Sequence, residues 1–128
     1  MIMKKFRFLL FILPVILFLN ACEKDFLSQQ TIDSNTPVSF SADVIPILSE
    51  DCAIPTCHIT GGHAPDLTPP NAYDQLTGLG YVDTANAEQS LLYIRITSPN
   101  KPMPPSAPLS SKEISYILVW IEQGAQNN

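Results

Sequence analysis

Cys52 and Cys57 lie close together near the middle of a chain that has only three cysteines, and His58 directly follows the second of them. Two thiols can add across the vinyl groups of a haem, while an adjacent imidazole can reach the iron from the proximal side. The usual spacing for this chemistry is Cys-x-x-Cys-His, whereas four residues separate the cysteines here. The segment therefore indicates covalent haem attachment with a longer loop between the two thiols.

Met103 lies in a proline-rich segment, preceded by Pro102 and followed by Pro104 and Pro105. Because prolines restrict the backbone, this segment should hold the thioether on a stiff loop and not on a helix face. Haem iron accepts His on one side and Met on the other, and the soft sulfur then favours Fe(II) and raises the reduction potential. The sequence thus offers two axial ligands, His58 and Met103.

Other assignments of these side chains stay open. His63 is an alternative distal ligand, although it is only five residues from His58 and would have to cross to the opposite face of the ring. Cys52 and Cys57 could instead form a disulfide in an exported binding or adhesion module, with His58 incidental. A zinc site made from the same cysteines and histidines lacks the paired spacing that is usual for thiolate zinc sites.

The chain begins like an export signal. Basic residues at positions 4, 5 and 7 precede the apolar run Phe8–Leu19, which is shorter than the roughly 20 residues of a membrane span. The segment Leu19–Cys22 resembles the lipobox of bacterial lipoproteins, so we expect residues 1–21 to be removed and Cys22 to carry the lipid anchor. A spare thiol in a signal that is cut further on is the plainer alternative. The expected location is the cell envelope, lipid-anchored to a membrane and facing the periplasm or the cell exterior.

Composition divides the remainder into an acylated, flexible tether at residues 22–38 and one domain at residues 39–128. Residues 22–128 contain four Lys and Arg against twelve Asp and Glu, which is a net charge of −8. Such a chain would repel phosphate backbones, so we expect no nucleic-acid partner and favour a basic or metal-bearing partner. A domain of this size usually needs a disulfide, a metal or a large cofactor to complete its core.

The first predicted helix covers about residues 40–50, with Ser41 as the N-cap. Pro46 should kink this helix or shorten it, and its C-terminal end would deliver Cys52. A short helical turn is predicted at residues 71–76, after two prolines.

Two further helices are predicted in the second half of the chain. Asn86 and Gln89 are spaced as an N-cap pair for a helix that Pro99 would stop. Ser110 and Glu113 form a capping box for a terminal helix. That helix carries an apolar stripe with Tyr116 and Trp120 beside it and Gly124 at its C-cap; the stripe consists of Ile114, Ile117, Leu118 and Ile121.

From Phe40 to Asn128 the sequence resembles a small class I cytochrome c domain, as found in exported bacterial lipoproteins. The residues that carry the resemblance are Ser41–Leu48 before the cysteines, Cys57-His58, Met103-Pro104-Pro105, Trp120-Ile121 and Gly124-Ala125. The resemblance implies an all-α fold, in which three main helices and long Pro-rich loops wrap around a covalently attached haem c.

The resemblance also implies roles for individual residues. Cys52 and Cys57 would form the thioether links, His58 would be the proximal iron ligand and Met103 the distal one. Pro65 and Leu67 resemble the Pro-x-Leu of the family, in which the proline carbonyl accepts a hydrogen bond from the proximal imidazole. That bond would orient the imidazole and raise its basicity.

An iron with both axial positions filled has no open site for a substrate, so we expect one-electron transfer and no enzymatic activity. The sequence has no Ser-His-Asp, paired-carboxylate or Gly-rich phosphate pattern. The expected partners are redox proteins, with no small-molecule substrate. Arg95 and Lys101 are candidates for pairing with the haem propionates, although solvated surface charges are the plainer interpretation.

Overall fold

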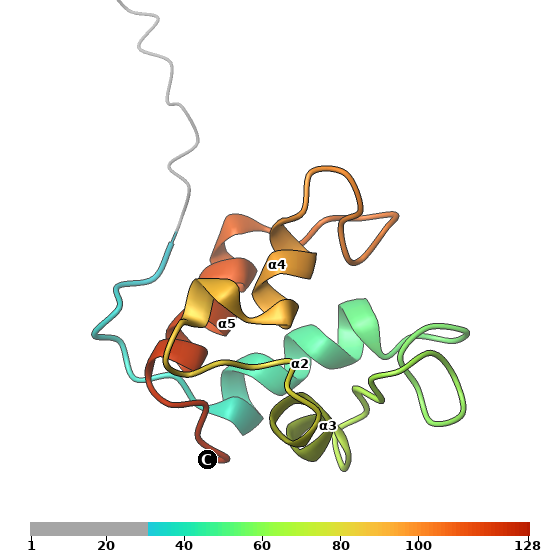
Figure 1. The fold of residues 1–128 in the computed structure, drawn as a ribbon, viewed down its shortest axis with the longest axis horizontal. Helices are drawn as coiled ribbons and strands as arrows, with labels where there is room; N and C mark the ends of the chain where they lie inside the picture. Colours follow the sequence, from blue (N-terminus) through green and yellow to red (C-terminus); the bar gives the residue numbers. More distant parts are fainter. Residues whose placement is uncertain (1–30) are drawn as a thin grey trace, which may run out of the picture.

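The structure, a computed structural model, describes residues 31–128. Figure 1 shows helices joined by long loops, and no β-strand occurs in this part of the chain. The elements in order are η1 (Phe40–Val44), α2 (Ile45–Ile47), η2 (Leu48–Cys52), α3 (Ala72–Gly78), η3 (Ala87–Gln89), α4 (Leu91–Thr97) and α5 (Ser111–Glu122). The described residues are therefore all-α, as predicted.

The predicted signal at residues 1–21 and the predicted lipid anchor at Cys22 lie outside the described residues. Within residues 31–128, no helix has both the length and the apolar character needed to cross a membrane.

The elements η1, α2 and η2 follow one another without a break and form one helical run from Phe40 to Cys52. Its two ends are wound in wide π-type turns, in which Ile45 N–H donates to Phe40 and Ala53 N–H donates to Leu48. Pro46 has no N–H to donate, and wide turns on either side leave room for its ring. The run therefore passes Pro46 and continues to Cys52, beyond the predicted end near residue 50.

The N-cap of this run is Ser39, so the prediction of Ser41 was wrong by two residues. The hydroxyl of Ser39 accepts from the N–H of Ala42 (3.2 Å), and Oδ2 of Asp43 accepts from the N–H of Ser39 (2.8 Å). Ser41 lies inside the first turn, where its N–H donates to the carbonyl of Asn128 (2.9 Å). These two bonds satisfy the N–H groups of Ala42 and Ser39, which the helix itself leaves without partners.

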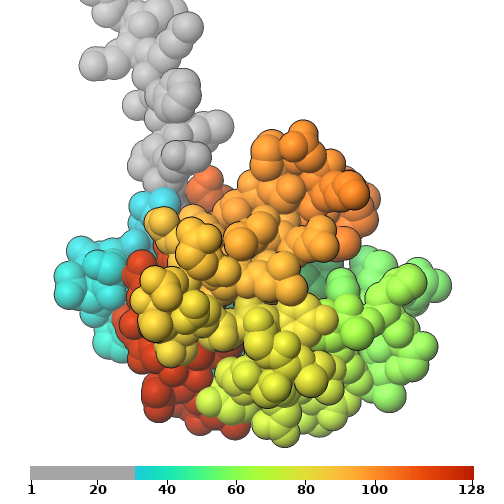
Figure 2. Space-filling view, viewed as in Figure 1, coloured from blue at the N-terminus to red at the C-terminus, as the bar shows by residue number. Residues whose placement is uncertain are grey.

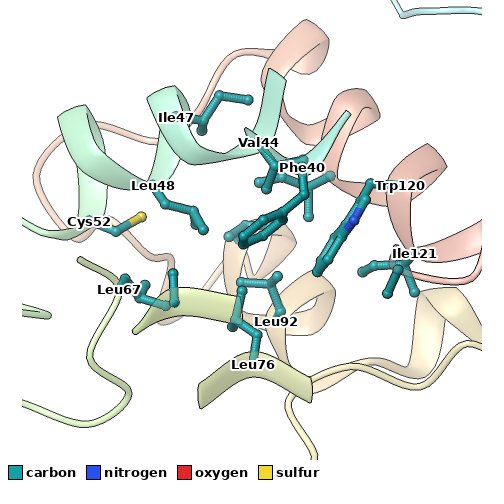
Figure 3. Packing of buried hydrophobic residues seen from close by; sticks show 14 of the residues in the cluster. Phe40, Val44, Ile47, Leu48, Cys52, Leu67, Leu76, Leu92, Trp120 and Ile121 are labelled. Carbon is teal, nitrogen blue, oxygen red and sulfur yellow. The ribbon is translucent and has the colours of Figure 1, made fainter. Parts of the chain in front are cut away.

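The centre of the core is aromatic. Trp120 is 1% exposed, and its ring lies 4.9 Å from that of Phe40, which in turn meets Tyr73 edge-on at 5.3 Å. The indole N–H donates to the carbonyl of Gln126 (2.9 Å). Figure 3 shows Phe40 and Trp120 side by side between the first helical run and α5. Trp120 therefore occupies the core itself, whereas the sequence pattern placed it beside the apolar stripe.

The predicted capping box of α5 is confirmed. Glu113 accepts from the N–H of Ser110 (2.6 Å), and the hydroxyl of Ser110 accepts from the N–H of Glu113 (3.3 Å). The helix ends in a Schellman motif, in which Gly124 N–H donates to Ile121 and Ala125 N–H donates to Trp120. Gly124 lies one position beyond the C-cap residue Gln123, and not at the C-cap as predicted. Its φ of +92° is a conformation that only glycine adopts freely.

The predicted helix from Asn86 onward is broken at Ser90. Residues 87–89 form the single turn η3, Ser90 is extended, and α4 begins after it. The Ser90 hydroxyl is tied to Asp83, whose N–H donates to it at 2.8 Å, and Asn86 donates its side-chain amide to the same aspartate. These local bonds compete with a continuous helix. The predicted turn at residues 71–76 is present as α3, which begins one residue later and ends two residues later than predicted.

Residues 31–38, predicted as part of the tether, pack against α5. Ile32 N–H donates to the hydroxyl of Ser115 (3.0 Å), and Val38 N–H donates to the side chain of Gln123 (3.0 Å). Gln123 also donates to the carbonyl of Thr36 (2.8 Å), and Val38 is buried. The packed part of the chain therefore begins by Ile32, because the side chains of Ser115 in α5 and of its C-cap residue Gln123 bond to the backbone of this segment.

Candidate functional site

One cavity of about 600 Å³ brings together every described residue that the sequence singled out as a ligand or attachment point. Figure 2 shows a notch in the surface between the segment around residue 100, in orange, and the segment around residue 60, in green. The predicted site residues that line the cavity are Cys52, Cys57, His58, Pro65, Leu67 and Met103. Segments that lie far apart in the sequence thus meet at one hollow.

Most of the remaining wall is apolar. α4 supplies several of the apolar residues, α3 supplies Leu76, and the Met103 loop closes one side. The further apolar residues are Ile54, Ala64, Leu76, Tyr81, Leu91, Leu92, Ile96, Pro104 and Pro105, and the polar ones are Asp51, Thr56, His63, Arg95 and Ser106. A mostly apolar pocket with a few convergent polar groups is typical of a cofactor site.

The loop between the two cysteines is a tight turn. Cys57 N–H donates to the carbonyl of Ile54 (3.0 Å), and His58 N–H donates back to the carbonyl of Cys52 (3.1 Å). Thr56 has φ +70°, which is unusual for a β-branched residue. This turn accommodates the two residues that the segment has beyond the usual Cys-x-x-Cys-His spacing. Cys52, Cys57 and His58 therefore still line one cavity.

Both cysteines within residues 31–128 are free thiols, and their surroundings differ. Cys52 is 7% exposed and lies beside Leu48 and Leu67 in the core, as Figure 3 shows. Burial raises the pKa of its thiol to about 12, with the negative charge of Asp51 and the neighbouring Cys57 adding to the effect. Cys52 is therefore a neutral thiol at physiological pH, whereas Cys57 is half-buried.

The imidazole of His58 is oriented by two backbone carbonyls. Nδ1 lies 3.0 Å from the oxygen of Pro65 and 3.2 Å from that of His63. Both neighbours only accept hydrogen bonds, so Nδ1 is the donor, and in the neutral imidazole this tautomer leaves the lone pair of Nε2 for a metal ion. The contact with Pro65 is the one that the resemblance implied, and Pro65 itself is buried.

Asp66 organises the same loop, a role that was not predicted from the sequence. Its Oδ1 accepts from the hydroxyl and the N–H of Thr68 (2.6 and 3.0 Å), and its Oδ2 accepts from Thr60 (2.7 Å) and Asn71 (2.8 Å). The bonds from Thr68 and Thr60 hold the pKa of this carboxyl well below its usual range. The Asp66-x-Thr68 spacing is a local turn signal that could have revealed it.

Gly62 lets this loop fold tightly on itself. A Cβ at this position would lie 2.3 Å from the carbonyl oxygen of Cys57 and 3.1 Å from that of Ile59. Next to it, Gly62 N–H donates to Ile59 and His63 N–H donates to Cys57, each at 2.8 Å. Glycine is therefore required because the backbone approaches itself here.

Met103 is attached to the end of α4. Its N–H donates to the carbonyl of Arg95 (3.0 Å), its side chain is 37% exposed at the cavity, and Pro104 after it is buried. Arg95, one of the two predicted partners of the haem propionates, also lines the cavity. Lys101 is not among the residues that line the cavity, so Arg95 is the better candidate for an anionic group there.

His63 lies on the same loop as His58 and also lines the cavity. Its carbonyl is one of the two acceptors for Nδ1 of His58, and its side chain is exposed. Within residues 31–128, no three side chains of His, Cys, Asp or Glu gather closely enough to hold a metal ion among themselves.

Comparisons of the chain with protein-family models, with curated proteins and with solved structures find no match.

Proposed function

We propose that this chain is a membrane-anchored c-type cytochrome that carries one electron on a covalently attached haem with His and Met ligands. The observation that carries the proposal is the cavity of about 600 Å³ that joins two thiols, an imidazole and a thioether. These groups come from the first helical run, the loop after it and the loop after α4. They are the attachment groups and axial ligands that a class I cytochrome c uses.

The residues present fit this group chemically. Cys52 and Cys57 would form the thioether links, Nε2 of His58 would be the proximal ligand and the sulfur of Met103 the distal one. When bound, the haem supplies a one-electron Fe(III)/Fe(II) couple. The apolar walls would exclude water, the carbonyl of Pro65 would strengthen His58 as a donor, and the soft sulfur of Met103 would favour the reduced state.

The proposal includes the class I cytochrome c fold, the absence of an enzymatic reaction and the location. With both axial positions filled, the protein would exchange electrons with partner proteins and would not turn over a substrate. Residues 31–128 carry ten Asp and Glu against three Lys and Arg, which favours a basic surface on the redox partner. A lipid on Cys22 would hold the protein at a membrane of the cell envelope.

The test is expression of the full chain together with haem-attachment machinery. We expect a coloured protein with a sharp absorbance spectrum on reduction, and haem that stays with the polypeptide during denaturing electrophoresis. Cys52→Ala combined with Cys57→Ala should abolish the covalent haem. Cys22→Ala is the matched control from the same chain, because it should release the protein from the membrane and leave the haem in place.

A colourless wild-type protein with a disulfide between Cys52 and Cys57 would overturn the proposal. That outcome would favour the alternative, in which the chain is an exported binding or adhesion module without haem.

A further inference from the structure

The carboxylate of Asp66 is saturated with hydrogen-bond donors. Its two oxygens accept four bonds, from Thr60, from the hydroxyl and N–H of Thr68, and from Asn71, at 2.6–3.0 Å. A carboxylate has about four lone-pair sites, and all four are used here only when the group is ionised. The arrangement therefore requires an acidic residue at this position.

The donors come from both arms of the loop that carries the proximal histidine. Thr60 lies just after His58, in the first half of the loop. Thr68 and Asn71 lie in the second half, where Asn71 is the N-cap residue of α3. Asp66 thus joins the two arms to each other and to the start of a helix. The backbone bond from Leu67 N–H to the carbonyl of His58 (2.8 Å) closes the loop at its base.

Asp66 stands between Pro65 and Leu67, which both hydrogen-bond to His58; the carbonyl of His63 is a further acceptor for its imidazole. Pro65 accepts from the imidazole, and Leu67 donates to the backbone carbonyl. We propose that Asp66 is the positioning residue of the proximal ligand: it holds the Pro65 carbonyl against Nδ1 of His58 and so sets the basicity of that imidazole. The inference rests on the function proposed above. Asp66 itself does not line the cavity, so it acts through Pro65.

The variant Asp66→Asn separates charge from size. The side-chain amide of asparagine has the same shape, but it carries one oxygen and one NH₂ group. Because each oxygen of Asp66 accepts from two donors, the NH₂ group would lie against two groups that also donate, and those hydrogen bonds would be lost. Hydrogen bonds to a charged acceptor are about twice as strong as neutral ones, so the loop should loosen. A less firmly held Pro65 carbonyl would leave His58 less basic, and a weaker proximal donor favours Fe(II).

Two readouts on the purified haem protein test this. The reduction potential of Asp66→Asn should be higher than that of the wild type. The amide of Leu67 should exchange its hydrogen at least about tenfold faster, which corresponds to the loss of one charge-assisted hydrogen bond. Thr60→Val should shift both quantities in the same direction by less, because it removes one of the four bonds, and Thr60→Ser should restore them.

Asp83→Asn is the matched control. Asp83 also accepts from nearby N–H groups, those of Ala85 and Asn86, and from the side-chain amide of Asn86, but in a loop whose bonds do not reach His58. It should leave the potential and the exchange of Leu67 unchanged. An unchanged potential in Asp66→Asn, with only a loss of stability, would overturn the proposal, because Asp66 would then have a purely structural role.

The role of Asp66 in the loop can be tested separately from the cytochrome function. If the wild-type chain carries no haem, the cytochrome proposal fails. The exchange of Leu67 then still decides the remaining claim: unchanged exchange in Asp66→Asn would overturn the role of Asp66 in holding the loop, and faster exchange would support it.

Discussion

The N–H of Met103 donates to the carbonyl oxygen of Arg95 at 3.0 Å, so the candidate distal ligand is tied to the C-terminal end of α4. Both side chains line the same cavity. Pro102 and Pro104 restrict the backbone on either side of Met103, and this hydrogen bond holds the backbone of Met103 against α4. The thioether is therefore presented from a rigid helix end, although it belongs to a loop.

Replacing Met103 tests the distal assignment. Met103→Ala should lower the reduction potential, because the soft sulfur that favours Fe(II) is lost, and it should open the sixth position to added ligands such as imidazole. Potentiometry and absorbance titration measure the two effects. His63→Ala is the matched control from the opposite loop and should change neither. If the two variants behave the other way round, His63 is the distal ligand.

Replacing Arg95 tests whether its positive charge acts at the cavity. Arg95→Leu should lower the potential, since a positive charge near the iron favours the reduced state, and the shift should shrink at high salt. Lys101→Leu removes the same charge six residues away, at a position that does not line the cavity, and should have a smaller effect. Equal shifts for the two variants would mean that only overall charge matters.

Gly62→Ala should destabilise the loop that carries His58. The added Cβ would lie 2.3 Å from the carbonyl oxygen of Cys57, so the backbone has to move, at a cost of about 1–3 kcal/mol. Unfolding by urea measures the change in free energy. Gly78→Ala is the control, because a Cβ there meets nothing within 4 Å in α3 and should stabilise by up to about 1 kcal/mol. Similar effects at both sites would contradict the crowding seen at Gly62.

The stability of the protein should fall in acid partly through Asp66. Hydrogen bonds from Thr68 and Thr60 lower the pKa of its carboxyl in the folded state, while the unfolded value is about 4. The unfolded chain therefore binds the proton first as the pH falls, and stability that is present above about pH 4 is lost progressively below it. The free energy of unfolding of wild type and Asp66→Asn should converge between about pH 5 and pH 2. A constant difference over that range would show that ionisation of Asp66 does not contribute.

Several features of the fold could be predicted because short-range physics decides them. The capping box of Ser110 and Glu113 and the glycine after α5 involve groups within one helical turn, and both are present. The start of the first helix was misplaced, because Ser39 and Ser41 are both good caps by residue type. In the structure both residues donate to the carbonyl of Asn128, which is distant in the sequence. Ser90 likewise interrupts a plausible helix through its bond to Asp83.

The sequence by itself determined the chemistry that is available: two thiols and an imidazole on one segment, and a thioether framed by prolines on another. It also indicated an all-α domain, because helix periodicity and capping depend on residues close together in the chain. Only the tertiary structure decided that these segments face one cavity of about 600 Å³, that Arg95 lines it and that Asp66 ties together the loop around His58. Those relationships depend on packing between segments that are distant in the sequence, and the spacing of residues within one segment does not reveal such packing.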